Sequence, residues 1–465
     1  WEWANRLDLA YYSKGPVVAL LIAASTAVFG DSEFAIRLPG LLCGLFLSLL
    51  MWFVLRRLAE RWIALLVWLL FRSTLFFFTL GLVITTDPPA MLLWFAVVAC
   101  GLRAVRFDAP WWWLPAGVLA GVAVLTKYTA LILPASVGFF LLCESSRRRH
   151  LRSPGFISGV LAGALLLVPV VVWNARHHWV NVLHNSGHLV QSEHPAIHLR
   201  FFPELLGAQI GLIGPALCVL LYLAAWAGFK RWRRYGDIAS GYLVLSAMPL
   251  AVVCVLVSLT KRVYANWPMP LFLGLFPLLA LLLAHLWQSR NEFWQPRLVR
   301  WSFGLNVVIV LFSLGPILGI TYGLPAERLP TKKLVGWREV GAAVDRLSAE
   351  FPNGSRPFLV NDRYGTLSAI RYYSSTRPDV MCSAIGDRRM NQYDIWQSDA
   401  DFLGRNALIV TNKEGMIEDY RRAFDEIQEI SEPLPIIYSS EVLRTFYFYK
   451  GTNYRGGLTT TPTHH

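Results

Sequence analysis

The 465-residue chain is 55% hydrophobic and 14% aromatic, and only 16% of its residues are charged. This composition excludes an ordinary soluble domain and is typical of a protein that crosses a membrane many times. The formal net charge of +13 is therefore no sign of nucleic-acid binding, because Lys and Arg in membrane proteins gather in the loops that stay in the cytoplasm.

The chain opens with a polar stretch, residues 7–16 (LDLAYYSKGP), followed by the apolar run 17–29 and by residues 30–39 (GDSEFAIRLP). Neighbouring tyrosines and a lysine fixed by a Gly-Pro turn predict a polar surface at the membrane boundary, suited to a lipid-linked phosphate. Because this stretch is predicted to lie outside the cytoplasm with no hydrophobic segment before it, we expect a natural span upstream of Trp1.

Hydropathy predicts about ten spans, each near the roughly 20 apolar residues that cross the hydrocarbon core. We place them at residues 38–55, 62–80, 88–102, 111–125, 128–143, 156–173, 205–229, 238–259, 268–286 and 301–322. Five cysteines lie inside these runs and Cys382 stands alone, so the sequence indicates no disulfide framework.

The basic clusters test this assignment independently. They fall at residues 56–61, 103–106, 147–152, 230–234 and 290–300, in alternate loops, which places these loops in the cytoplasm. The same rule places the opening segment, the turns at Asp87 and Lys127, the loop 174–202, the turn 261–262 and the C-terminal part on the outer side.

From residue 323 to 455 the pattern becomes globular. A helix is predicted at 336–351, strands at 358–360, 380–381, 407–411 and 446–449, and further helices at 364–373 and 413–427. This predicts a small α/β domain after a transmembrane domain of residues 1–322. Residues 456–465 lack apolar periodicity, and we expect a flexible tail.

Cations on the outer side are the first candidates for chemistry, because charges at membrane depth are costly and mark sites or internal pairs. Lys14, on its turn, suits a phosphate, although a lysine that snorkels toward bulk headgroups would look the same. Lys127 lies between two apolar runs with almost no loop, so it cannot easily reach solvent.

Lys261, Arg262, Tyr264 and Asn266 form the densest outer basic patch, which resembles a phosphate clamp but is also compatible with simple helix-end charge. Asp87, before Pro88, is either a helix N-cap or a residue that orients substrate.

Other polar residues of the outer loops complete the predicted cavity: Tyr11, Tyr12, Tyr128, Asn174 and Arg176. The adjacent His177 and His178 could hold a metal, but no ligand signature such as HExxH accompanies them. Arg72 lies in mid-span, and its partner cannot be named from sequence.

Five segments in order carry a resemblance: YYSKGP, GDSEFAIRLPG, TTDPPAM, LTKYTALILP and WNARHHW. They resemble the membrane-embedded glycosyltransferases of the protein-mannosyltransferase-like family 39, which includes relatives of the lipid A aminoarabinose transferase. In the C-terminal part, GDRRMNQYDIW is similar to a segment of bacterial members. The resemblance covers most of the chain.

The resemblance implies a GT-C fold, with an extracytoplasmic C-terminal domain, in the inner membrane of a bacterium. It implies inverting transfer of a sugar from a polyprenyl-phosphate carrier to a glycan, lipid or protein acceptor. Lys14, Lys127 and Tyr264 match carrier-binding positions and Asp87 matches the second acidic position, while the main catalytic Asp of the family would lie upstream of Trp1. Ser13 replaces a metal-binding carboxylate, which makes a divalent metal doubtful.

Two other classes remain open at this point. A transporter or flippase for lipid-linked sugars would also have many spans and interior charges, but it usually shows related halves, and no convincing internal repeat is present. A non-catalytic scaffold would leave the outer cations and aromatics unexplained.

Overall fold

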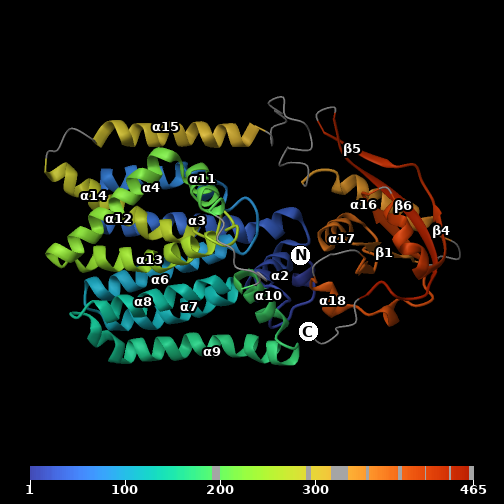
Figure 1. Ribbon diagram of the computed structural model, residues 1–465, viewed down its shortest axis with the longest axis horizontal. Coiled ribbons are helices and arrows are strands. Elements are labelled where there is room, and N and C mark those ends of the chain that lie inside the picture. Colours follow the sequence, from blue (N-terminus) through green and yellow to red (C-terminus); the bar gives the residue numbers. More distant parts are fainter. Residues whose placement is uncertain are drawn as a thin grey trace. The chain divides into compact units, whose positions relative to one another are not determined.

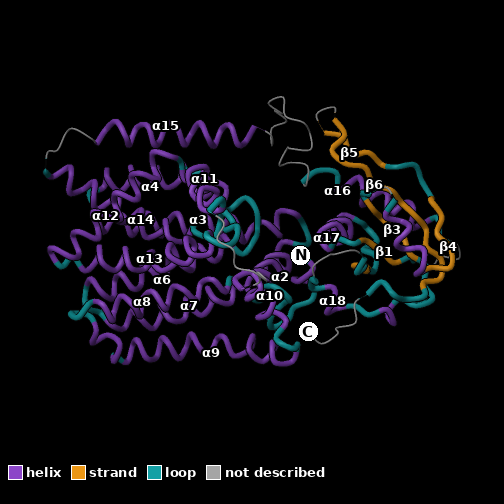
Figure 2. Tube along the Cα trace, viewed as in Figure 1, coloured by secondary structure: helices purple, strands orange, loops and turns teal. Residues whose placement is uncertain are grey.

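The computed structural model describes residues 1–190, 199–289, 295–315, 334–351, 356–385, 390–413, 415–438 and 441–459. They form two compact units, one of Trp3–Ser313 and the other of Trp1–Glu2 with Leu314–His465. Figures 1 and 2 show that the described part of the first unit is helical, whereas the described strands all belong to the second.

A short helix, α1 (Glu2–Asn5), opens the chain. The helices that follow are α2 (Val17–Phe29), α3 (Glu33–Leu58), α4 (Arg61–Ser73), α5 (Leu75–Thr79), α6 (Asp87–Arg106), η1 (Pro110–Trp112), α7 (Trp113–Thr126), η2 (Tyr128–Leu131), α8 (Ile132–Cys143), η3 (Arg148–Arg152), α9 (Pro154–Arg176), α10 (Val180–Val190), α11 (Phe201–Ile213), α12 (Pro215–Tyr235), α13 (Ile238–Ser258), α14 (Met269–Gln288) and α15 (Gln295–Leu314).

Among the described residues, six helices are long and apolar enough to cross a membrane: α3, α6, α9, α13, α14 and residues 297–314 of α15. The bent pair α11 and α12 raises this number to seven if it forms one span. The prediction of about ten spans therefore exceeds the number of described single helices that are long enough to cross a membrane. The other apolar helices among the described residues are only 10–17 residues long. The prediction of a multispanning helical protein is confirmed.

Two predicted spans are interrupted. The segment 62–80 breaks between α4 and α5, where the guanidinium of Arg72 donates to the carbonyl of Phe77. The segment 205–229 breaks at Gly214, where α11 and α12 meet at 104°. Gly214 has a positive φ of 98°, and Asn306 donates to the carbonyl of Ile213 beside it, at 2.9 Å. These local polar contacts satisfy backbone groups that the breaks would otherwise leave without partners.

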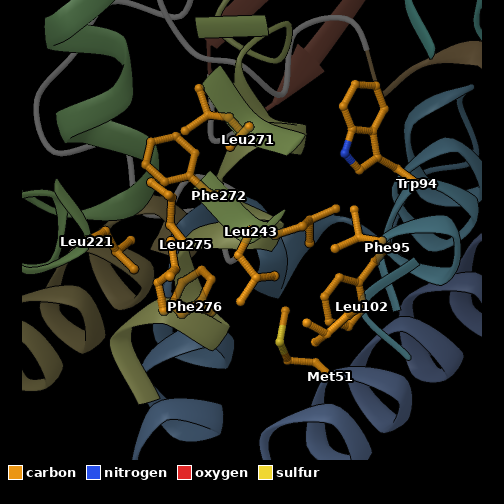
Figure 3. Packing of buried hydrophobic residues seen from close by; sticks show 14 of the residues in the cluster. Met51, Trp94, Phe95, Leu102, Leu221, Leu243, Leu271, Phe272, Leu275 and Phe276 are labelled. Atoms are coloured by element: carbon orange, nitrogen blue, oxygen red, sulfur yellow. The ribbon is translucent and has the colours of Figure 1, made fainter. Parts of the chain in front are cut away.

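The core of the helical unit is built from large side chains of α3, α6, α13 and α14 (Figure 3). Met51, Phe95, Leu243 and Phe272 are all fully buried. Unlike these helices, α9 has only 17% of its best apolar window buried, so most of its surface is left for lipid.

Glycines explain how α9 is held against α7. A Cβ on Gly117 would lie 2.1 Å from the carbonyl oxygen of Gly159, and one on Gly121 would lie 2.8 Å from that of Gly163. Within each helix the two glycines are four residues apart, which is the small-residue pattern that lets membrane helices approach closely. Van der Waals contact of the two backbones therefore stabilises this pair.

The second unit contains α16 (Trp337–Ala349), β1 (Phe358–Asn361), α17 (Tyr364–Tyr373), β2 (Val380–Cys382), α18 (Tyr393–Trp396), η8 (Asp399–Asp401), β3 (Ala407–Thr411), η9 (Met416–Ala423), β4 (Phe424–Glu429), β5 (Leu434–Tyr438) and β6 (Glu441–Tyr454). The strand order is β2-β1-β3-β6-β4, with β5 also paired to β6. The pairs of β1 with β2 and β3 are parallel, and all pairs of β6 are antiparallel.

Alternation along the strands gives this sheet two apolar faces. Leu359 and Leu408 pack with α16 and α17 on one face, whereas Phe358 and Ile409 pack with η9 on the other. The sheet is therefore covered on both sides, which confirms the predicted α/β class.

One helix prediction for this unit is wrong, and the tail prediction is wrong at residues 456–459, whereas residues 460–465 lie outside the described part of the chain. Residues 413–427 do not form one α-helix, because η9 gives way to β4, which pairs with β6 in the register Glu426 to Thr452. The predicted flexible tail is not free where it is described: Leu458 is buried, and the N–H of Gly457 donates to Asp399. Pairing and burial distant in sequence override the local pattern in both places.

Candidate functional site

An ion pair between Asp87 and Lys127 is the centre of the candidate site. The Lys127 Nζ lies 2.7 Å from Asp87 Oδ1, and the two side chains are only 12% and 15% exposed. The amide of Asn266 donates to the other oxygen, Oδ2, at 2.7 Å. Three segments that lie far apart in the sequence thus meet at one carboxylate.

The N-cap explanation of Asp87 is wrong. Thr86 occupies the N-cap of α6, and the N–H of Asp87 donates to the hydroxyl of Thr85 at 3.1 Å. The carboxylate of Asp87 is instead committed to Lys127 and Asn266. At the first turn of the helix, a negative charge is also stabilised by the helix dipole.

Lys14 belongs to the same electrostatic neighbourhood. Its pKa is lowered, first by burial and then by the positive charge of Lys127, while the charge of Asp87 opposes the shift. Gly15 allows this approach, because a Cβ there would lie 1.9 Å from the carbonyl oxygen of Leu125, two residues before Lys127. We call Lys14, Asp87, Lys127 and Asn266 the lysine site.

Helix α10 holds the backbone beside Lys14, which the sequence did not reveal. Asn181 donates to the carbonyls of Tyr11 and Lys14, and Asn185 donates to that of Ser13 at 3.2 Å. The Tyr11 N–H also donates to the Lys14 carbonyl, at 2.9 Å, which closes the turn. No sequence signal separated these asparagines from other loop amides, since their partners lie about 170 residues away.

Tyr11 does not face a cavity, contrary to prediction. It is fully buried, its ring stacks on Trp3 at a centroid distance of 4.4 Å, and its hydroxyl donates to the carbonyl of Trp3. Burial raises the pKa of Tyr11 to about 12. Tyr12 instead lies against the ring of His184 at 4.6 Å, and Tyr128, next to Lys127, is half-buried.

Asn174 and the adjacent histidines have structural contacts. Asn174 is buried, donates to the carbonyl of Val170 and accepts from the N–H of Val182, so it joins α9 to α10 and does not line a cavity. The ring of His177 stacks on Trp173 at 4.0 Å, and His178 is exposed with a φ of 52°.

Neither histidine is part of a metal site that the described residues could form, since no group of three His, Cys, Asp or Glu side chains there is placed to hold a metal ion. The prediction of metal ligation by His177 and His178 thus has no support in the geometry. Arg176 is exposed at the end of α9.

The turn after α13 contributes Asn266 but not its arginine. Arg262 pairs with Glu204 of α11 at 3.0 Å, in an exposed salt bridge, and so does not complete the predicted clamp. Tyr264 is 56% exposed and packs against Trp267, and Lys261 is half-buried at the start of the turn. Of the predicted cations, Lys127 thus contacts Asp87 directly, as does the amide of Asn266, whereas Lys14 is linked to them by electrostatic interaction.

The chain is similar in sequence to known proteins. Residues 13–173 match the model of the dolichyl-phosphate-mannose-protein mannosyltransferase family. Lipid A galacturonosyltransferase RgtD of Rhizobium johnstonii is 27% identical over 369 residues, which cover 75% of this chain and 72% of that protein. An undecaprenyl phosphate-alpha-4-amino-4-deoxy-L-arabinose arabinosyl transferase of Erwinia tasmaniensis is 26% identical over 303 residues, which cover 61% of this chain but only 51% of that protein.

The fold is also similar to a solved structure. The crystal structure of ArnT from Cupriavidus metallidurans bound to undecaprenyl phosphate superimposes with a TM-score of 0.59 and 16% identity, over 96% of this chain and 91% of that one. At this identity the match establishes the fold alone.

Proposed function

We propose that this chain, a membrane glycosyltransferase of the GT-C superfamily related to the protein-mannosyltransferase-like enzymes, transfers a sugar from undecaprenyl phosphate to a lipid A-type glycolipid. The donor proposal draws on the arabinosyl transferase relative and the acceptor proposal on the galacturonosyltransferase. The basic ends of the helices lie in the cytoplasm, and the lysine site faces the periplasm of a bacterial inner membrane.

The observation that carries the proposal is the charge balance of the lysine site. Two lysines and one carboxylate leave one positive charge in excess: Asp87 pairs with Lys127, and the charges of both residues act on Lys14. Burial and Lys127 disfavour the cationic form of Lys14, so an anion bound there would relieve an unfavourable arrangement. A phosphate group at a membrane surface is such an anion.

Stabilising the departing phosphate is the chemistry that this site can supply. A glycosyl phosphate leaves as an anion, and preorganised cations stabilise the negative charge that develops on it in the transition state. Both carboxylate oxygens of Asp87 are engaged, so we assign Asp87 to positioning Lys127 and not to deprotonating the acceptor. The lysine site therefore supplies cations for the leaving phosphate and no base for the acceptor hydroxyl.

The test measures release of undecaprenyl phosphate from a panel of undecaprenyl-phosphate sugars, by the full-length protein in liposomes that contain lipid A. We expect acceptor-dependent release, lowered about 100-fold in Lys14→Gln and Lys127→Gln, because a misplaced or missing charge-stabilising group typically costs this much. Lys230→Gln, at the arginine-rich end of α12, is the control and should retain activity.

Two outcomes would contradict the proposal. Wild-type turnover in both lysine variants would remove the lysine site from the reaction. Movement of intact lipid-linked sugar across the bilayer, without release of carrier phosphate, would indicate a transporter.

A further inference from the structure

A groove at the arginine-rich end of the helical unit has no part in the chemistry described above. It has a volume of about 260 Å³ and lies between α3 and α6, with apolar walls that include Leu50, Val54, Ala96 and Ala99. Its remaining lining includes Arg57, Arg103 and Arg106. We call it the arginine groove.

The groove extends along α3 and α6 from their arginine-rich ends toward the middle of both helices. Arg57 lies in the last turn of α3, and Arg103 and Arg106 lie in the last turn of α6. Leu50 and Ala96 each precede an arginine of the rim by seven residues, so the apolar walls extend about 10 Å below the charges. Phe53 and Phe107, which also line the groove, are 58% and 62% exposed and thus present an apolar mouth to lipid.

Aromatic rings and a backbone carbonyl, not carboxylates, position Arg103 and Arg106. The guanidinium of Arg103 lies over the ring of Trp112 at 4.7 Å, and that of Arg106 lies 5.6 Å from Phe107. Arg106 also donates to the carbonyl of Arg57 at 3.1 Å. In the part of the chain that the structure describes, no acidic side chain forms a salt bridge with any of the three.

This combination differs from a row of arginines that merely sets orientation. Positive charges at helix ends need only open solvent and bulk headgroups, whereas these three arginines line a groove together with apolar side chains such as Leu50, Val54 and Ala96. Basic pockets between membrane helices on the cytoplasmic side are suited to anionic lipid headgroups.

We propose that the arginine groove binds one anionic glycerophospholipid, with its phosphate among Arg57, Arg103 and Arg106 and one acyl chain along Ala96 and Ala99. Three cations without a carboxylate favour an anionic headgroup over a zwitterionic one, whose own cation would be repelled. The site is distinct from the lysine site, because Asp87 and Arg106 are the two ends of α6, about 28 Å apart.

The experiment measures retention of dioleoyl phosphatidylglycerol by the full chain in detergent micelles, using native mass spectrometry and a lipid titration of thermal stability. Dioleoyl phosphatidylethanolamine is the zwitterionic comparison and inorganic phosphate the headgroup comparison. We expect phosphatidylglycerol to bind at least about tenfold more tightly than phosphatidylethanolamine, since each surface cation contributes severalfold to the binding of an anionic lipid. Inorganic phosphate should give no stabilisation.

Two variants test the two halves of the groove separately. The triple change Arg57→Gln, Arg103→Gln and Arg106→Gln should weaken phosphatidylglycerol binding about tenfold or more. The matched control, which also removes three charges from the same end of the unit, is Lys230→Gln, Arg233→Gln and Arg234→Gln on α12, and it should leave binding within about twofold.

Ala99→Phe should reduce retention by filling the groove with the arginines intact. Equal binding of the two lipids, equal loss in both triple variants, or stabilisation by inorganic phosphate would each overturn the proposal. Sugar transfer is measured in parallel, and because the groove lies far from the lysine site, failure of one proposal leaves the other standing.

Discussion

The pairing of Asp87 with Lys127 makes a quantitative prediction that separates folding from function. Both side chains are at most 15% exposed, and their charged atoms lie 2.7 Å apart, so this is an ion pair largely removed from water. Asp87→Asn keeps the shape of the side chain and an oxygen for Asn266 but leaves Lys127 as an uncompensated charge. Conversely, Lys127→Met leaves the carboxylate of Asp87 as an uncompensated negative charge.

Breaking a buried pair by removing one partner typically costs about 3 to 5 kcal/mol, whereas replacing both partners by neutral groups is often close to neutral. We therefore expect each single variant to lose about 3 kcal/mol of unfolding free energy. The double variant Asp87→Asn with Lys127→Met should lose much less than the sum, which corresponds to a coupling energy of about 2 kcal/mol or more.

Equilibrium unfolding in mixed micelles with increasing dodecyl sulfate measures the free energy of unfolding of the unchanged protein, the two single variants and the double variant. Release of undecaprenyl phosphate measures activity in the same preparations. The double variant should recover stability but not activity, because Lys127 is absent. The exposed pair Arg262–Glu204 is the matched control, and Glu204→Gln should cost no more than about 1 kcal/mol. Additive losses in the double variant, or recovery of activity along with stability, would refute the reasoning.

Three further predictions follow from single contacts. Gly15→Ala would place a Cβ 1.9 Å from the Leu125 carbonyl and displace Lys14, so transfer should fall about 100-fold while Gly138→Ala, with open space at its Cβ, stays active. Burial, and then the positive charges of Arg147 and Arg149, lower the pKa of His150 below its ordinary value near 6.5. The contribution of His150 to the free energy of unfolding should therefore be constant above about pH 6.5 and decrease as the pH falls further. Thermal unfolding measured against pH should lose this dependence in His150→Phe. Although burial opposes the shift, hydrogen bonds from residues 374–376 lower the pKa of Asp345 to about 2. The stability that Asp345 contributes is therefore present above about pH 4 and is lost as the pH falls toward 2. In Asp345→Asn, the amides of α16 in the full chain should exchange hydrogen faster at pH 7.

The sequence predicted most strongly those elements whose own pattern is decisive. Helix α17 was predicted with the bounds observed, Tyr364–Tyr373, and β3 with the bounds Ala407–Thr411, because apolar period and flanking turns agree there. β4 was missed, since its sequence FDEIQE has the charge of a surface helix and is made a strand by pairing with β6. The break at Gly214 was missed because hydropathy averages over it.

The candidate site was predictable in its parts but not in its connections. Lys127 and Asp87 could each be identified by the cost of placing a charge between apolar runs. That they pair with each other, across 40 residues, and that Asn266 joins them across 179, depends on how the helices pack. Tyr11 shows the opposite error: an aromatic residue in a functional segment was assigned to the cavity, but it supports that segment from within the fold.

The carboxylate that pairs with Lys127 sets the net charge of the lysine site. Asp87 lowers the net charge of the lysine site from near +2 to near +1, which matches the single charge of a glycosyl phosphodiester. The released phosphate monoester carries about 1.5 to 2 negative charges near pH 7. Negative charge therefore increases along the reaction coordinate beside cations that are already in place, so that their stabilisation grows from ground state to transition state, as acceleration of the chemical step requires. Since Asp87 itself makes no new bond in this scheme, we expect its effect on rate to depend on where it holds Lys127.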